Sequence, residues 1–298
     1  MNGLVSIIIP TYNRGHLIQH TIESVQNQTY IHWELIIIDD GSTDNTKHVV
    51  KQLRDSRIHY YSIDHCGIIG KVRNTGMQFT KGDYIAFLDS DDLWVPNKLS
   101  FQLALFAQYK QVAFTFSHGE QFGNGAIPPP LLETFLIGNI FYAHLLEGRF
   151  VIYPSTFIFK KEVLNTIEWF DENFSAGESD FFLRIARKFD GIFSGEKLVK
   201  LRKHAQNISR ERAFIFSLDN IRMIKKFLNK DYLTKKEYII LASKQHYKLG
   251  LLYLKHGNPS ESFKSFIEYS RLKPFNYKGW IRLTQAWLSG MRTNQLLI

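Results

Sequence analysis

Cysteine is nearly absent from this sequence, because Cys66 is the only one among 298 residues. A single cysteine closes no intrachain disulfide and leaves no cysteine pair for a structural zinc site. Long apolar runs are missing too, since stretches such as Leu35–Ile38 are far shorter than the ~18 residues of a membrane-spanning helix. The N-terminus has no basic segment, and Pro10 interrupts its apolar run, so a secretory signal is not expected. We therefore expect a cytoplasmic globular protein.

Glycine-rich phosphate loops are missing as well. A dinucleotide-binding loop would place Gly-x-Gly-x-x-Gly after the first apolar run, but Pro10–Gly15 reads Pro-Thr-Tyr-Asn-Arg-Gly. The Walker pattern Gly-x-x-x-x-Gly-Lys-Ser/Thr is absent from the whole sequence. We therefore expect any bound phosphate to be held by a metal ion or by basic side chains.

Acidic residues are scarce in the last third of the chain. Residues 210–298 contain 17 Lys and Arg against 6 Asp and Glu, whereas residues 1–209 contain 20 against 22. The overall net charge of +9 therefore comes from the C-terminal part. We interpret this excess first as a solvated helical surface and second as a surface for an anionic partner.

Four apolar runs near the N-terminus predict the strands of a parallel sheet. They span Val5–Pro10, Trp33–Asp40, Ile58–Ser62 and Tyr84–Leu88. Helical patterns separate these runs, and strands that are apolar on both faces require helices on both sides of the sheet. Ligands in such folds bind beyond the carboxyl ends of the strands, which here carry Asp39-Asp40 and Asp89-Ser90-Asp91-Asp92.

The rest of the chain predicts a less regular middle and a helical C-terminal part. We expect strands over Gln111–Ser117, Phe150–Phe159 and Leu198–Lys203, and helices over Leu131–Leu146, Lys161–Thr166 and Glu178–Lys188. From Ser209 onward the pattern is helical, so we place one domain at residues 1–209 and a second region at 210–298. The second region contains one tetratricopeptide-like hairpin, marked by the spacing of Leu249, Gly250, Tyr253, Ser262, Phe266 and Pro274.

One helical face near the C-terminus combines apolar and basic residues. Its members are Trp280, Leu283, Trp287 and Met291, with Lys278, Arg282 and Arg292 nearby. We expect this face to pack on its own domain. The alternative is that it lies in a membrane interface, where it would bind apolar and anionic lipid together.

The acidic cluster after the fourth run fits a divalent metal. Asp89 and Asp91 are two residues apart at a strand end, so both side chains can face the same side. Carboxylate oxygens are hard ligands that suit Mg²⁺ or Mn²⁺ and bridge them to substrate phosphates. The alternative is an acidic turn that only caps the next helix.

Four blocks then follow one another in the order of a known family. They are Val5–Arg14, Trp33–Asp44, Arg73–Gly76 and Lys81–Asp92. Together they resemble the family-two inverting glycosyltransferases with the GT-A fold, and the resemblance extends to about residue 209. It implies a Rossmann-like mixed α/β sheet with helices on both faces, followed by an all-α C-terminal annex. The nucleotide-sugar-binding half would span about residues 1–95 and the acceptor half about residues 96–209.

The resemblance also implies roles for single residues. Asp40 would hydrogen-bond the base, Arg73 would lie near the diphosphate, Asp89 would contact the ribose, and Asp91 would bind a divalent metal, Mn²⁺ or Mg²⁺. His204, in the block that closes the catalytic domain, would supply a third metal ligand. For Arg73, the alternative is a solvated helix charge. The full nucleotide-sugar-binding set is Pro10, Thr11, Tyr12, Arg14, Asp40, Arg73, Asp89 and Ser90.

The catalytic base is expected at the start of the helix over Glu178–Lys188. Counting back from Arg184, Glu178 occupies the position where the family has its catalytic Asp, and Gly177 replaces the preceding acid. Inversion in one step needs a carboxylate that removes the proton of the acceptor hydroxyl. Glu178 is the first choice and Asp180 the second, although Asp180 can equally serve only to cap the helix.

The resemblance implies a metal-dependent inverting transferase in polysaccharide biosynthesis. It would move a sugar from a nucleotide-sugar, above all a UDP-sugar, to a saccharide or lipid-linked glycan acceptor. A lipid-linked acceptor would place the basic C-terminal helices peripherally on the inner face of the membrane. Nucleic acid is not an expected partner. Two alternatives are a nucleotidyltransferase, which the absent glycine-rich loop disfavours, and a catalytically degenerate module that binds partners through its helical C-terminus.

Overall fold

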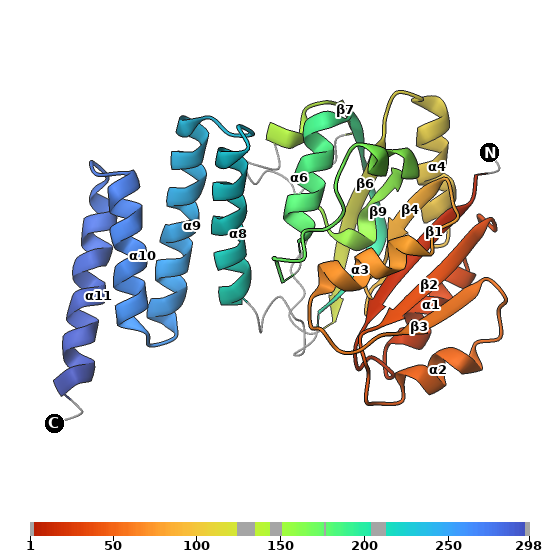
Figure 1. Ribbon diagram of the computed structural model, residues 1–298, viewed down its shortest axis with the longest axis horizontal. Helices are drawn as coiled ribbons and strands as arrows, with labels where there is room; N and C mark the ends of the chain where they lie inside the picture. Colours follow the sequence, from red (N-terminus) through yellow and green to blue (C-terminus); the bar gives the residue numbers. More distant parts are fainter. Residues whose placement is uncertain (1–2, 124–134, 144–150, 176, 204–212, 296–298) are drawn as a thin grey trace. The chain divides into compact units, whose positions relative to one another are not determined.

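The computed structural model describes residues 3–123, 135–143, 151–175, 177–203 and 213–295 (Figure 1). The chain forms two compact units, Met1–Asn207 and Ile208–Ile298. A large sheet with helices makes up the first unit, and the described residues of the second unit form helices.

The N-terminal half of the first unit is a parallel sheet. Its strands are β1 (Val5–Thr11), β2 (Trp33–Asp39), β3 (Ile58–Ser62) and β4 (Tyr84–Phe87). The helices between them are α1 (Ile18–Gln26), α2 (Thr46–Gln52) and α3 (Ile69–Gln78). Strand β1 pairs with β2 on one side and β4 on the other, so the carboxyl ends of these three strands lie at one edge of the sheet.

The second half adds antiparallel pairs and makes the sheet mixed. Its strands are β5 (Leu93–Trp94), β6 (Phe114–Gly123), β7 (Leu136–Gly138), β8 (Ile158–Lys160) and β9 (Gly191–Lys203). The order in the sheet is β3-β2-β1-β4-β8-β6-β9-β5, and β7 also pairs with β9. β8 is antiparallel to β4, whereas β6 and β9 are parallel. The predicted mixed α/β fold is confirmed.

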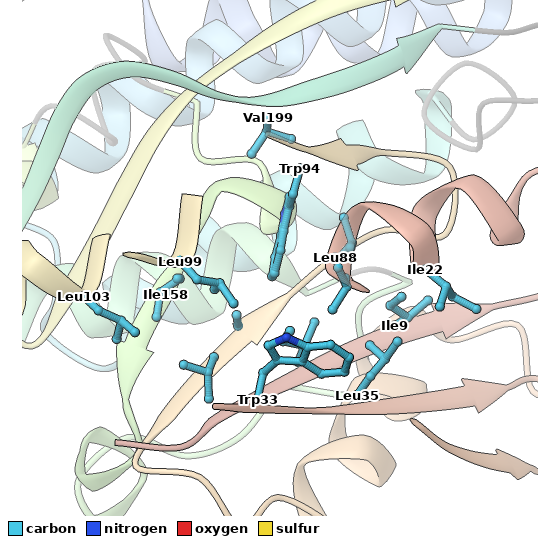
Figure 2. Close-up of a cluster of buried hydrophobic side chains, with 14 of the residues drawn as sticks. Ile9, Ile22, Trp33, Leu35, Leu88, Trp94, Leu99, Leu103, Ile158 and Val199 are labelled. Atoms are coloured by element: carbon cyan, nitrogen blue, oxygen red, sulfur yellow. The ribbon is translucent and has the colours of Figure 1, made fainter. Parts of the chain in front are cut away.

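Alternate residues of β1 pack on opposite faces of the sheet. Ile9 belongs to a cluster with Ile22 of α1 and Leu99 of α4 (Lys98–Gln108), which Figure 2 shows. Ile8 packs on the other face with residues of α3 and with Phe181 of α6 (Glu178–Lys188). Because side chains alternate along a strand, a strand covered by helices on both faces is apolar throughout.

Two elements of the middle differ from the prediction. The helix expected over Leu131–Leu146 is wrong at Leu136–Gly138, which forms β7 and pairs antiparallel with β9. The strand expected over Phe150–Phe159 begins only at Ile158, because Pro154 starts a short 3₁₀ helix, Pro154–Thr156. Proline has no N–H to donate to a strand ladder, so it favours the first turn of a helix.

The second unit is a row of helices. They are α8 (Ala213–Asn229), α9 (Lys235–Lys255), α10 (Pro259–Leu272) and α11 (Tyr277–Gln295). Neighbours in the chain pack on one another, and α11 ends the row (Figure 1). Helix α9 begins with a capping box of Thr234 and Glu237, and Asn258 caps α10 ahead of Pro259. Ser262 donates to the carbonyl of Gly250 at 2.9 Å, which joins the two helices of the predicted hairpin.

The expected single face of α11 is divided between two environments. Leu283 is only 8% exposed and packs with Phe266, whereas Trp280 and Trp287 are 55% and 51% exposed. Thus the prediction that these residues pack together on their own domain is wrong for the two tryptophans. The side chain of Met291 lies outside the described part of the chain. Within the described residues, no helix has both the length and the apolar character needed to cross a membrane.

Lys98, the first residue of α4, is fully buried. Its burial leads us to expect that the free energy of unfolding depends on pH. Its Nζ donates to Oε1 of Gln102 at 2.6 Å and lies 4.2 Å from the ring centroid of Trp94. Burial lowers the pKa of Lys98 well below its usual range. Unfolding therefore takes up a proton at pH values between the folded pKa and about 10.4, the value for an exposed lysine.

We expect the unfolding free energy to rise with pH in that window, relative to the Lys98→Met variant, by up to about 1.4 kcal/mol per pH unit. Urea unfolding of both proteins over the neutral to alkaline range measures this difference. Lys47→Met, which changes an exposed lysine of α2, is the control and should give a curve parallel to the wild type. A parallel curve for Lys98→Met would show that Lys98 does not change its charge on unfolding.

Candidate active site

The candidate site lies at the carboxyl ends of the central strands. Thr11 ends β1 and pairs in register with Asp39 at the end of β2. Asp89 follows β4, two residues beyond the Phe87 that pairs with Ile8 of β1. The parallel register therefore brings together acidic residues that lie about 50 positions apart in the sequence.

Asp40 holds the loop that follows β3. Its carboxylate accepts hydrogen bonds from the backbone N–H groups of Cys66 at 2.8 Å and Gly67 at 2.9 Å. Nδ1 of His65 lies 2.9 Å from the same carboxylate, and the His65 ring stacks on Tyr12 with centroids 4.2 Å apart. Tyr12, expected in the nucleotide-sugar-binding set, and Asp40, expected at the base, thus both contact His65. Asp40 also has a positioning role that the sequence did not indicate.

Asn13 ties the loops after β1 and β2 together, although sequence reasoning gave it no role. It adopts a positive φ of 51°, a conformation that asparagine tolerates better than most residues. Its side-chain oxygen accepts from the N–H of Thr43 at 2.8 Å, and Ser42 accepts from the N–H of Asn13 at 2.8 Å. Arg14 is joined to the same region, because its N–H donates to Thr46 at 2.9 Å.

Arg73 connects three elements at the centre of the site. It is 1% exposed, and its two terminal nitrogens each lie 2.7 Å from a carboxylate, one of Asp89 and one of Glu178. Helix α3 supplies the arginine, the end of β4 supplies Asp89, and the start of α6 supplies Glu178. The alternative interpretation, in which Arg73 is a solvated charge on a helix surface, is therefore wrong.

Hydrogen bonds from three other segments of the chain hold the turn Asp89–Asp92. The hydroxyl of Ser155 accepts from the N–H of Asp89 at 3.1 Å and donates to Asp92 at 2.6 Å. Arg202 of β9 donates from its backbone to Asp92 at 3.0 Å and from Nε to the carbonyl of Asp91 at 2.9 Å. On a third side, the hydroxyl of Thr21 donates to the carbonyl of Ser90 at 3.1 Å.

The carboxylates of this turn repel one another. Desolvation raises the pKa of Asp89, an effect that Arg73 opposes and Asp91 strengthens. Desolvation, followed by repulsion from Asp91 and Asp89, raises the pKa of Asp92 well above its usual range. A divalent cation would relieve this repulsion, and carboxylate oxygens are suitable donors for Mg²⁺ or Mn²⁺.

The described residues supply only part of a metal site. They contain no group of three or more His, Cys, Asp or Glu side chains that could hold a metal ion. His204, the predicted third ligand, lies outside the described residues. The chemistry of Asp89 and Asp91 therefore fits a hard cation, although these two carboxylates alone do not complete its coordination.

Glu178 and Asp180 occupy different environments at the start of α6. The Glu178 side chain is 23% exposed, whereas Asp180 is 1% exposed and pairs with Arg184 at 2.8 Å. Arg184 in turn donates to the carbonyl of Trp169 at 2.9 Å, so Asp180 helps to hold the preceding loop. Gly177 caps the helix with φ of +77°, a conformation that favours glycine. An acidic side chain at this position would be strained in that conformation.

The match to a known family covers the strands and the acidic turn of this site, but it ends before Glu178 and the rest of α6. Residues 6–168 match glycosyl transferase family 2. One relative is the UDP-Glc:alpha-D-GlcNAc-diphosphoundecaprenol beta-1,3-glucosyltransferase WfgD of Escherichia coli, 41% identical over 42% of this chain and 49% of that protein. The putative colanic acid biosynthesis glycosyl transferase WcaA of Escherichia coli K12 is 33% identical over 67% of this chain and 72% of its own length. The matched part of this chain spans about half of the length of WfgD, and the same holds for WfaP and TuaG.

Solved structures share the fold at low sequence identity. TarS of S. aureus superposes with a TM-score of 0.69 and 16% identity, over 95% of this chain and 88% of that one. A mannosyltransferase from Pyrobaculum calidifontis, in complex with GDP-Man and Mn²⁺, has a TM-score of 0.61 and 16% identity over 99% and 88% of the two chains. With more than half of its residues matching the family and its sheet matching these folds, this chain belongs to glycosyl transferase family 2.

Proposed function

We propose that the chain is a metal-dependent inverting glycosyltransferase that uses a UDP-sugar and a lipid-linked glycan acceptor. The observation that carries this proposal is the buried bridge of Arg73 between Asp89 and Glu178. The bridge joins the acidic turn Asp89–Asp92, expected at the leaving diphosphate, to Glu178, the carboxylate expected at the acceptor. A single displacement requires both groups around one anomeric carbon.

The names of two relatives support the donor and acceptor classes. WfgD and WfaP of Escherichia coli, 41% and 44% identical over their matched parts, are both named for UDP-Glc and a GlcNAc-diphosphoundecaprenol acceptor. We extend the UDP-sugar and the lipid diphosphate to this chain as its substrate classes. His65, which stacks on Tyr12 and contacts the carboxylate of Asp40, supports a base pocket at the end of β1.

The metal would be held by Asp91, with Asp89 in the same turn and His204 as the expected third ligand. When bound, such an ion offsets the negative charge that develops on the leaving diphosphate. The protein prepares this turn in advance, because Ser155, Arg202 and Thr21 fasten it from three sides.

Glu178 acts on the acceptor in this proposal. The acceptor hydroxyl loses its proton to Glu178 as its oxygen bonds to the anomeric carbon, and the bond from that carbon to the diphosphate oxygen breaks. The leaving oxygen keeps the electron pair. Arg73 contacts Oε1 of Glu178, so we assign the proton to Oε2. Arg73 is a positioning residue here, because it orients the base and offsets charge beside Asp89.

Calorimetric titration of UDP, GDP and dTDP, each with and without Mn²⁺, tests the donor site. We expect UDP to bind, and Mn²⁺ to strengthen its binding in the wild type by at least roughly tenfold, because an ion held by Asp91 would offset the charge of the diphosphate. Asp91→Asn should lose most of that gain and keep the weaker metal-independent binding.

The control for this titration is Asp83→Asn, an exposed acid at the opposite end of β4. It should bind UDP and Mn²⁺ as the wild type does. Equal metal dependence in Asp91→Asn and the wild type would contradict the metal assignment. If no nucleotide bound at all, the catalytically degenerate module would become the better description.

A further inference from the structure

Helix α11 has apolar side chains on two opposite faces. The inner face packs on α10 through Gly279, Leu283 and Ala286, and a Cβ on Gly279 would come within 2.7 Å of Tyr269. An outer stripe follows from helical spacing, since residues three or four apart share one side. We define the outer stripe as Tyr277, Trp280, Ile281, Trp287 and Leu288, all exposed.

The turn before α11 extends this apolar surface. Phe275 is fully exposed between α10 and α11. Nε1 of Trp280 donates to the carbonyl of Pro274 at 2.9 Å, which satisfies the polar group of the indole. The exposed remainder of that ring is apolar, and the hydrogen bond holds the ring against the turn.

Charge around the outer stripe has one sign. After Glu268 the sequence contains no Asp or Glu, but it contains Arg271, Lys273, Lys278, Arg282 and Arg292. Among the described residues, no carboxylate forms an ion pair with Lys273 or Lys278. The whole region from residue 210 carries a net charge of +11. The complementary partner is therefore anionic and has an apolar layer behind its charge.

We infer that the outer stripe and Phe275 dock on the surface of an anionic phospholipid bilayer. Tryptophan and tyrosine rings favour the level of the lipid head groups, and Ile281, Leu288 and Phe275 can enter the acyl boundary. Lysine and arginine side chains beside them attract the anionic head groups. A second copy of this chain fits less well, because a two-fold contact would bring identical basic surfaces together.

This inference rests on the proposed function in one respect, namely that a lipid-linked acceptor lies at a membrane. Vesicle binding is measured without donor or acceptor, so the two proposals can fail separately. Transfer to a detergent-solubilised acceptor, measured in parallel, reports on the proposed function alone.

Cosedimentation of the full chain with vesicles is the test. The wild type should bind vesicles of phosphatidylcholine with phosphatidylglycerol, bind vesicles of phosphatidylcholine alone far less, and lose binding at high salt. Ile281→Glu should weaken binding at least roughly tenfold, because it places a negative charge in the apolar stripe. Lys278→Gln should weaken it roughly fivefold, which corresponds to about 1 kcal/mol.

The matched control is Ile31→Glu. Ile31 in the first unit is 64% exposed, comparable to the 58% of Ile281, so the same substitution changes an equally exposed isoleucine that is not part of the outer stripe. It should bind vesicles as the wild type does, and circular dichroism should show that both variants fold. Brominated lipid should quench tryptophan fluorescence of the wild type but quench Ile281→Glu much less.

The inference is overturned if the wild type does not bind anionic vesicles, or if Ile281→Glu and Ile31→Glu bind equally well. It is also overturned if the wild type is a dimer that Ile281→Glu converts to a monomer and neither binds vesicles. That result would assign the outer stripe to a second copy of the chain.

Discussion

Glu178→Gln should lower the rate of sugar transfer by about 10²–10⁴-fold and leave the protein folded. Glutamine retains the shape of the side chain and an oxygen that accepts from Arg73, but it cannot take the proton of an acceptor hydroxyl. Binding of the UDP-sugar should change little, because the proposed contacts of the donor lie with Asp40 and the acidic turn. Release of UDP in the presence of donor and acceptor measures the rate, and calorimetry measures donor binding.

Two further variants make this result specific. Glu196→Gln changes an exposed glutamate of β9 in the same way and should transfer at the wild-type rate. Asp180→Asn should lower stability, because it weakens the buried pair with Arg184, whose distance is 2.8 Å. If Glu178→Gln kept near-normal turnover while folded Asp180→Asn lost it, the base would be Asp180.

Arg73→Met should destabilise the protein by about 3–5 kcal/mol and abolish measurable transfer. The side chain of Arg73 is 1% exposed and neutralises two carboxylates, so its loss removes the counter-charge of Asp89 and Glu178, whose side chains are 35% and 23% exposed. The aromatic rings of Phe87 and Phe170, 5.8 and 5.7 Å from the guanidinium carbon, would also lose a cation contact. Urea unfolding gives the free energy, and UDP release gives the rate.

The pH dependence of the Arg73→Met effect identifies its cause. Desolvation already raises the pKa of Asp89, and Arg73 is the group that opposes this rise. Without Arg73, the folded-state pKa of Asp89 should rise further above its unfolded value of about 3.9, so folding becomes easier once the carboxylate is protonated. The destabilisation relative to wild type should therefore shrink as the pH falls through that folded-state pKa.

Two control variants distinguish the effect of the Arg73 charge from the effect of its planar guanidinium group. Arg73→Lys keeps the charge but lacks the planar fork that reaches two carboxylates at once, so it should recover more stability than transfer. Arg222→Met removes an arginine whose side chain is 66% exposed and paired with Asp219 at 3.3 Å, and it should cost less than about 1 kcal/mol. An Arg73→Met protein as stable as Arg222→Met would contradict the buried bridge.

The parallel half of the sheet could be predicted from the sequence because its signals are local. Each of its strands is a short apolar run, as in Trp33–Asp39, and each ends where polar residues begin. The same contiguous stretches carry the motifs of the family. The antiparallel half gives weaker signals: β5 has two residues and β7 has three, too few to show an alternating pattern. Pairing with the long strand β9 stabilises them as strands.

For the candidate site, the sequence indicated several residues but not the contacts among them. Asp40, Arg73, Asp89 and Glu178 were expected from the family blocks, and the structure places the last three in one bridge. Ser155 carried no signal, because nothing near it in the sequence shows that its hydroxyl contacts Asp92, 63 residues earlier.

The fold class, the family blocks and the basic C-terminal region are evident in the amino-acid sequence, since each is encoded in neighbouring residues or in composition. The burial of Arg73 between two carboxylates, the pairing of Asp180 with Arg184 and the exposure of the α11 tryptophans emerge only from the folded chain. Burial and pairing depend on contacts between residues far apart in the chain. Helical and strand periodicity shows which residues share a face, but it does not show what covers that face.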